Sequence, residues 1–274
     1  MKYFLETLRL RNEPLFYFGL SCLLAALVGG LLIRLTSTQI TGVNAWYQPF
    51  KFFVSLGVFA WTMGWYLAYL GPRPGLGWYA WLVVILLGLE VAYIAGQAAR
   101  GQRFHFEVGT PLYAALYGGM ALAAVAVALA TAYVGGLFFW RDFPELPAAY
   151  VWGIRLGIAL FVVFAMQGLA MGSRLAHTIG GPDGGPGLPV VNWSTRHGDL
   201  RIAHFAGLHA LQVLPLLSFY LVQNVPVILI VGADPRPVGG LGLFPGPARQ
   251  TAVALRRPRV GKQQPLLPRV PGST

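Results

Sequence analysis

The sequence predicts an all-α protein: a polytopic bundle of about six transmembrane helices, with a Gly/Pro-rich loop before the last span. Hydrophobic residues make up 56% of the 274 residues, charged residues make up only 11%, and the mean hydropathy is +0.60. A soluble domain carries about 25% charged residues, which it needs to cover its surface. Apolar runs of about 20 residues recur along the chain, as membrane-spanning helices require.

Six apolar segments are long enough to span a bilayer, and turn residues separate them. The expected spans are Leu15–Ile33, Phe50–Leu70, Trp78–Gln97, Pro111–Trp140, Ala148–Met171 and Leu200–Ile230. Thr110 before Pro111 predicts a helix start, because threonine caps helices and proline suits the first helical position. Within the fourth span, Ala115, Gly119 and Ala123 recur every four residues, a spacing that indicates close helix packing.

The composition changes abruptly after residue 232. Residues 233–274 hold eight prolines, six glycines and seven basic residues against one acidic residue. This composition is typical of disordered chain. We therefore expect a transmembrane domain at 1–232 and a basic, disordered tail at 233–274. The tail is either a genuine basic segment or the frame-shifted reading of a gene that once encoded another helix.

The formal net charge of +11 points to a membrane surface and not to nucleic acid. Basic residues beside membrane helices mark cytoplasmic loops or contact with anionic lipid. A nucleic-acid-binding protein would carry a folded basic motif, and the sequence contains none.

The five histidines gather toward one face of the predicted bundle. We number the loops in chain order, so that loop one follows the first expected span and loop five precedes the sixth. Helices that cross a membrane alternate in direction, so loops one, three and five must lie on the same face of the membrane. His105 lies in loop three, His177 and His197 lie in loop five, and His204 and His209 follow in the last span. This gathering indicates either a functional site or the usual collection of polar residues in the longer loops.

Polar residues inside the apolar spans predict an intramembrane site open to that face. A charge at such depth costs at least about 2.5–3.5 kcal/mol, so Glu90 of the third span needs a partner inside the bundle. We expect the polar residues of the third span to meet those of the sixth, with Arg155 as a rival partner for Glu90. The predicted site comprises Glu90, Gln97, His204, His209 and Gln212.

Loop five is predicted to form a structured cap over the bundle. It runs for nearly thirty residues, with five glycines and three prolines between Gly180 and Pro189. Prolines fix φ and glycines permit positive φ, so this backbone is shaped by sharp turns. The cap residues that we single out are Asp183, Trp193 and Asp199, of which Asp199 can cap the last helix.

The run from His177 to Pro215, HTIGGPDGGPGLPVVNWSTRHGDLRIAHFAGLHALQVLP, resembles the signature region of a group of uncharacterised multi-pass bacterial membrane proteins. WYQPFKFFVSLGVFAWTMGWYL and QAARGQRFHFEVGTP are similar to other parts of that group. The resemblance covers roughly residues 44–222 and stops before the tail, where members continue with a further helix. It implies the bacterial inner membrane and carries no activity.

Three functions fit these observations. The first is an intramembrane site that handles protons, an ion or a small solute, since histidine changes charge near neutral pH. The second is a redox protein that binds haem or a transition metal. The third is an accessory or structural protein, whose partners would be the lipid bilayer and other membrane subunits. No nucleophile-base motif such as G-x-S-x-G or H-E-x-x-H favours an enzyme.

The haem or metal function would use histidines from different helices. His204 and His209 are five residues apart, about 140° around a helix, so they cannot hold one haem between them. Either would need His105 or His177 as the opposite ligand. The candidate ligands are His105, His177, His204 and His209.

Overall fold

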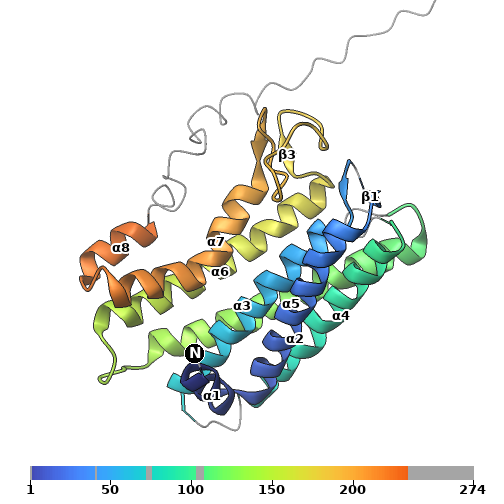
Figure 1. Cartoon of the computed structure of the whole chain (residues 1–274). Helices are drawn as coiled ribbons and strands as arrows, with labels where there is room; N and C mark the ends of the chain where they lie inside the picture. Colours follow the sequence, from blue (N-terminus) through green and yellow to red (C-terminus); the bar gives the residue numbers. More distant parts are fainter. Residues whose placement is uncertain (1, 41, 72–75, 103–107, 234–274) are drawn as a thin grey trace, which may run out of the picture. The chain divides into compact units, whose positions relative to one another are not determined.

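The computed structural model describes residues 2–40, 42–71, 76–102 and 108–233. The chain divides into two units, 1–244 and 245–274, and all the described residues belong to the first. The predicted tail from residue 234 onward and His105 lie outside the described residues. The helices of the described part are α1 (Lys2–Arg11), α2 (Glu13–Leu35), α3 (Tyr47–Tyr69), α4 (Gly77–Ala99), α5 (Pro111–Trp140), α6 (Ala148–Arg174), α7 (Leu200–Tyr220) and α8 (Val225–Ala233) (Figure 1).

Six of these helices, α2 to α7, are long and apolar enough to cross a membrane. The shortest, α7, has 21 residues, and at 1.5 Å per residue this length covers the roughly 30 Å of a bilayer's hydrocarbon core. The prediction of an all-α polytopic bundle with six spans is confirmed. The chain is a multi-pass membrane protein.

Local sequence sets three of the helix starts. The Asn12 side chain accepts a hydrogen bond from the Leu15 amide at 3.1 Å where α2 begins. Thr110 accepts from the Tyr113 amide at 3.3 Å, as predicted for the start of α5. Asp199 caps α7 and accepts from the Arg201 amide at 3.0 Å. Each cap satisfies an amide that has no partner within its helix.

The helices pack mainly as neighbouring pairs, α2 with α3 and α6 with α7, and α4 and α5 join the two pairs. Glycines allow the closest approaches. A Cβ atom at Gly157 of α6 would lie 2.9 Å from the Ala210 carbonyl of α7, and one at Gly57 would lie 2.9 Å from Leu23. Nothing lies within 4 Å of the Cβ position at Gly119, and both Gly119 and Ala115 are exposed, so the predicted close packing is not found at Gly119. Small residues permit close packing, but the neighbouring helices decide which face receives it.

The expected span Leu200–Ile230 is two helices. α7 ends at Tyr220, where the amides of Leu221 and Val222 both bond the Leu217 carbonyl. α8 follows, with Asn224 at its start and Pro226 in its first turn. Both residues are typical of a helix start, but the surrounding apolar residues make the segment look like one continuous span in the sequence. The nine residues of α8 cover about 14 Å, less than half of the hydrocarbon core.

Two short antiparallel strand pairs lie at one end of the bundle. In loop one, β1 (Gln39–Ile40) pairs with β2 (Val43–Asn44), and in loop five, β3 (Thr178–Ile179) pairs with β4 (Gly198–Asp199). Figure 1 shows β1 and β3 at the same end, as helix alternation predicts, and α1 at the other. These are called the loop-five end and the α1 end below.

Candidate functional site: the α3–α7 seam

The polar side chains of α7 hydrogen-bond to α3. His209 Nε2 lies 3.2 Å from the Ser55 hydroxyl, and Gln212 Nε2 donates to the Thr62 hydroxyl at 3.3 Å. Ser55 and Thr62 are seven residues apart, and His209 and Gln212 are three apart, so each pair shares one helix face. Both bonds lie well inside the spans, His209 being nine residues, about 14 Å, beyond the start of α7.

Tyr66 adds a third contact because α7 contains a proline. Pro215 has no amide hydrogen, so the carbonyl four residues before it, on Leu211, has no partner within the helix. The Tyr66 hydroxyl donates to this carbonyl at 2.8 Å. We define the α3–α7 seam as Ser55, Thr62 and Tyr66 of α3 with His209, Leu211 and Gln212 of α7. The sequence places only His209 and Gln212 in the predicted site, since serine, threonine and tyrosine are common in spans and carry no distinguishing pattern.

Polar aromatic residues extend the seam to the α1 end. The Tyr69 hydroxyl accepts from Trp65 Nε1 at 2.8 Å and lies 3.4 Å from the Tyr150 hydroxyl of α6. The Arg11 guanidinium stacks 3.7 Å above the Trp65 ring and donates to its backbone carbonyl at 3.2 Å. Polar groups on α3 therefore continue from Ser55 to the last turn, where their partners lie on α6 and α1 instead of α7.

Two amide oxygens near the seam have no hydrogen-bond partner among the described residues. These are Gln212 Oε1 on α7 and Gln167 Oε1 on α6. Gln167 also donates to the Leu200 carbonyl at 3.4 Å. A buried oxygen without a donor costs about 1–3 kcal/mol. Both oxygens are therefore sites that a water molecule or another hydrogen-bond donor would stabilise.

His204 faces a different helix from His209. Its Nδ1 lies 2.6 Å from the Phe164 carbonyl of α6, which requires Nδ1 to carry the proton in this contact. A Cβ atom at Gly168 would lie 3.2 Å from the His204 ring, so the glycine makes room for it. His204 and His209 of α7 thus serve two interfaces, α6–α7 and α3–α7.

Glu90 and Gln97 lie on α4, which packs on α2, α3 and α5. Gln97 is buried, and Glu90 is half-buried and forms no hydrogen bond or ion pair with the other described residues. The structure brings His209 and Gln212 to α3 and not to Glu90. Arg155 is occupied elsewhere: it donates to the carbonyls of Phe138 and Arg141 at 2.9 Å, where α5 ends.

The cap residue Asp199 forms a two-pronged ion pair with Arg201. Arg201 Nε donates to Oδ1 at 2.9 Å and Nη2 to Oδ2 at 2.6 Å, and the Asp199 side chain is fully buried. The Ser194 amide also donates to Oδ2 at 2.8 Å. Burial opposes ionisation, but the hydrogen bonds from Arg201 and the Ser194 amide outweigh it and hold the pKa of Asp199 below its ordinary value.

Asp183 organises the first half of loop five. It accepts from the amides of His177 and Thr178, at 3.0 and 2.8 Å, and contacts His177 Nδ1 at 3.1 Å. Partial burial opposes ionisation, but these hydrogen bonds outweigh it and lower the pKa of Asp183 to about 2. Burial and the nearby Arg201 lower the pKa of His177, and this effect exceeds that of the Asp183 carboxylate.

Trp193 connects the loop to the seam. Its ring packs edge-on against Phe205 with centroids 5.4 Å apart, and the Phe205 and His209 rings lie 4.3 Å apart. Lys51 of α3, one helical turn above Ser55, donates to the Val191 carbonyl of the loop at 3.5 Å. Asp183 and Asp199 thus accept hydrogen bonds from backbone amides of loop five, and Trp193 is connected to His209 of the seam through Phe205.

Among the described residues, no group of three or more His, Cys, Asp and Glu side chains is placed to hold a metal ion. His177 pairs with Asp183, and His204 pairs with the Phe164 carbonyl. The fourth candidate ligand, His105, lies outside the described residues. Binding of haem or a metal stays a prediction.

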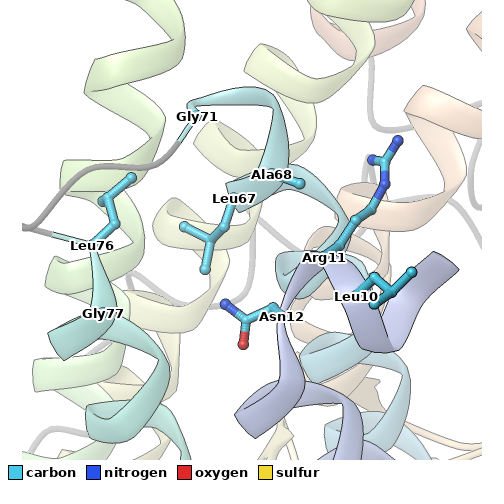
Figure 2. A pocket seen from close by; sticks show the side chains of 8 residues that line it. All are labelled: Leu10, Arg11, Asn12, Leu67, Ala68, Gly71, Leu76 and Gly77. Carbon is cyan, nitrogen blue, oxygen red and sulfur yellow. The ribbon is translucent and has the colours of Figure 1, made fainter. Parts of the chain in front are cut away.

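A cavity of about 420 Å³ lies at the α1 end and not in the seam. Figure 2 shows the corner of α1 and α2, which carries Asn12, facing the end of α3 and the start of α4, and Leu67 and Leu76 also line the cavity. No residue of the seam lines it. The seam side chains contact one another directly instead of surrounding this space.

No protein-family model matches the chain, and no curated protein or solved structure matches it significantly. Its function therefore has to be inferred from the chemistry of its own side chains.

Proposed function

We propose that the protein passes protons across the membrane along the α3–α7 seam, with His209 as the central proton-exchanging group. The observation that carries the proposal is the hydrogen bond between His209 and Ser55 deep in the spans, continued by Gln212–Thr62 and by Tyr66. Histidine exchanges a proton near neutral pH, and hydroxyl groups both donate and accept hydrogen bonds. Polar residues at this depth are costly and mark ion or proton pathways.

The direct contacts within the seam favour protons over larger solutes. Side chains at 3.2 and 3.3 Å leave no room for a solute between them, whereas a proton moves along hydrogen bonds. The unpaired Gln212 oxygen provides an acceptor for a water molecule beside the two bonds. Such a water would link the Ser55–His209 and Thr62–Gln212 contacts into one chain.

The membrane that we propose is the bacterial inner membrane. This location rests on the resemblance of residues 44–222 to multi-pass bacterial membrane proteins. The six apolar spans support a multi-pass membrane location in general.

Proton flux into liposomes tests the proposal. The full chain is reconstituted with an internal pH-sensitive dye, and a potassium gradient with valinomycin supplies the driving force. We expect His209→Ala to reduce the flux by about tenfold or more, because a positioned proton-transfer group contributes at least about a hundredfold in other proteins. Ser55→Ala should have a smaller effect, since water can replace one hydroxyl group.

Ser21→Ala is the matched control. This serine donates to the Tyr17 carbonyl of its own helix at 2.8 Å on an exposed face of α2, so its removal should leave the flux unchanged. Wild-type flux no greater than that of empty liposomes would overturn the proposal and favour the accessory role. Equal flux in wild type and His209→Ala would remove His209 from the pathway.

A further inference from the structure

Residues 187–194 of loop five form a tight hairpin above the seam. A bridge between Gly187 and Ser194 closes it, and the Leu188 amide donates to the Trp193 carbonyl at 2.8 Å. At its tip the Val191 amide donates to the Pro189 carbonyl at 2.7 Å, so Val190 is the centre of a three-residue turn. We call residues 187–194 the loop-five hairpin.

The backbone of the hairpin tip is strained. Val190 has φ of +67° and Asn192 has φ of +55°. A β-branched residue rarely adopts positive φ, and such a conformation persists only where the surroundings hold it in place. Strain of this kind gathers at ligand clamps and switches.

Charged side chains from the two seam helices hold the strained tip. Arg201 Nη2 donates to the Asn192 carbonyl at 2.6 Å, and Lys51 donates to the Val191 carbonyl. Asp199 accepts from the Ser194 amide and orients Arg201 through their two-pronged pair. The hairpin is thus fastened to α3 and α7 at the point where the seam opens toward the loop-five end.

Aromatic rings link the hairpin to the centre of the seam. Trp193 packs on Phe205, Phe205 packs on His209, and His209 contacts Ser55. Phe205 and His209 are four residues apart on one face of α7, so the Phe205 ring limits the orientations of the imidazole. A displacement of Trp193 would remove one side of this support.

We propose that the loop-five hairpin is a gate over the α3–α7 seam, and that Phe205 is a positioning residue that holds the His209 ring toward Ser55. With the hairpin fastened, Trp193 packs on Phe205 and Phe205 packs on the half-buried His209 ring from the loop-five end. With the hairpin released, water reaches Ser55 and His209 more often. This gate rests on the proposed proton pathway for its role, but its existence is testable without any measurement of flux.

Thiol labelling tests the gate. Cys22, the single cysteine, is replaced by alanine, and Ser55→Cys is introduced as a probe in the full chain in mild detergent. A charged methanethiosulfonate reagent then reports how often water reaches this position. We expect Trp193→Ala to raise the labelling rate about three- to tenfold. Loss of one aromatic pair should shift the equilibrium between the fastened and the released hairpin by this factor.

Trp140→Ala is the matched control, because this tryptophan at the opposite end of the bundle is 91% exposed. Its labelling rate should equal that of the parent. If Trp193→Ala does not fold, Phe205→Leu removes the same ring contact and keeps the apolar volume. The parent here is the protein with Cys22→Ala and Ser55→Cys alone. If a folded protein with Trp193→Ala or Phe205→Leu is labelled at the same rate as this parent, the gate is overturned.

The outcomes of the two experiments are separable. Faster labelling without proton flux keeps the gate and removes the proton pathway. Flux that depends on His209, with labelling unchanged by Trp193→Ala or Phe205→Leu, keeps the pathway and removes the gate. Phe205→Leu should reduce the proton flux, as His209→Ala does, although it leaves the imidazole of His209 in place.

Discussion

In loop five, Arg201 binds Asp199 with bonds of 2.9 and 2.6 Å, whereas in the α3–α7 seam the two bonds between side chains have lengths of 3.2 and 3.3 Å. The cap bonds join full charges, which shortens and strengthens them. The seam bonds join neutral hydroxyl, amide and imidazole groups, and the Gln212 oxygen is left without a donor. The comparison indicates a rigid cap above a polar path that can exchange its hydrogen bonds.

Replacement of Asp199 by alanine tests the rigid half of the comparison and should have the largest effect. It removes the α7 cap and leaves Arg201 without its carboxylate. We expect a loss of about 3–5 kcal/mol in the free energy of unfolding, the cost of breaking a buried ion pair. Chemical denaturation in detergent measures it. A loss below about 1 kcal/mol would show that the cap is no more rigid than the seam.

Acid should loosen the cap through Asp183. Its pKa is lowered to about 2 from an ordinary 3.8, so its stabilising effect is present above about pH 4 and is lost as the pH falls toward 2. The protection factors of the His177 and Thr178 amides, which are the intrinsic exchange rates at each pH divided by the observed rates, should therefore fall across this range. Asp183→Asn should show low protection at both pH values. An unchanged pH response in that variant would assign the effect to another group.

Tyr66→Phe should cost less than the cap variant. The Leu211 carbonyl would lose the donor that replaces the missing amide of Pro215. We expect a destabilisation of about 1 kcal/mol, because hydrogen bonds within a membrane contribute about 0.6 and rarely more than about 1.7 kcal/mol. Thermal unfolding in detergent provides the measurement. Tyr133→Phe, on an exposed face of α5, serves as the control with no expected change.

A double-mutant cycle between Ser55→Ala and His209→Ala should show a coupling of about 0.6 kcal/mol. Glu90→Gln combined with His209→Ala should be additive, since His209 bonds to α3 and Glu90 lies on α4. The two cycles share one variant and so control each other. Coupling only in the second cycle would reassign the centre of the seam to Glu90.

Gln212→Leu should have the smallest effect on stability. It removes a bond of 3.3 Å together with an amide oxygen that has no donor, and loss of a half-satisfied polar group is close to neutral. We expect the free energy of unfolding to change by less than about 0.5 kcal/mol while proton flux falls. A large destabilisation with normal flux would make Gln212 a structural residue like Asp199.

Much of the architecture follows from the sequence alone. The apolar runs determine six spans because a bilayer requires about 20 apolar residues to satisfy the backbone within each helix. Thr110 and Asp199 determine the starts of α5 and α7, since a cap bonds an amide only two or three residues away. Helix alternation also determines that the strand pairs of loops one and five, β1–β2 and β3–β4, lie at the same end of the bundle.

Only the tertiary structure decided which helices meet. His209 and Gln212 stand out in the sequence, but their partners are Ser55 and Thr62, residues whose type and spacing occur in many spans. Glu90 has the stronger signal in the sequence, but it lies on α4, whereas the hydrogen bonds of His209 and Gln212 run to α3. The physical reason is that burial cost identifies a polar residue from its own segment, whereas its partner depends on how helices far apart in the chain pack together.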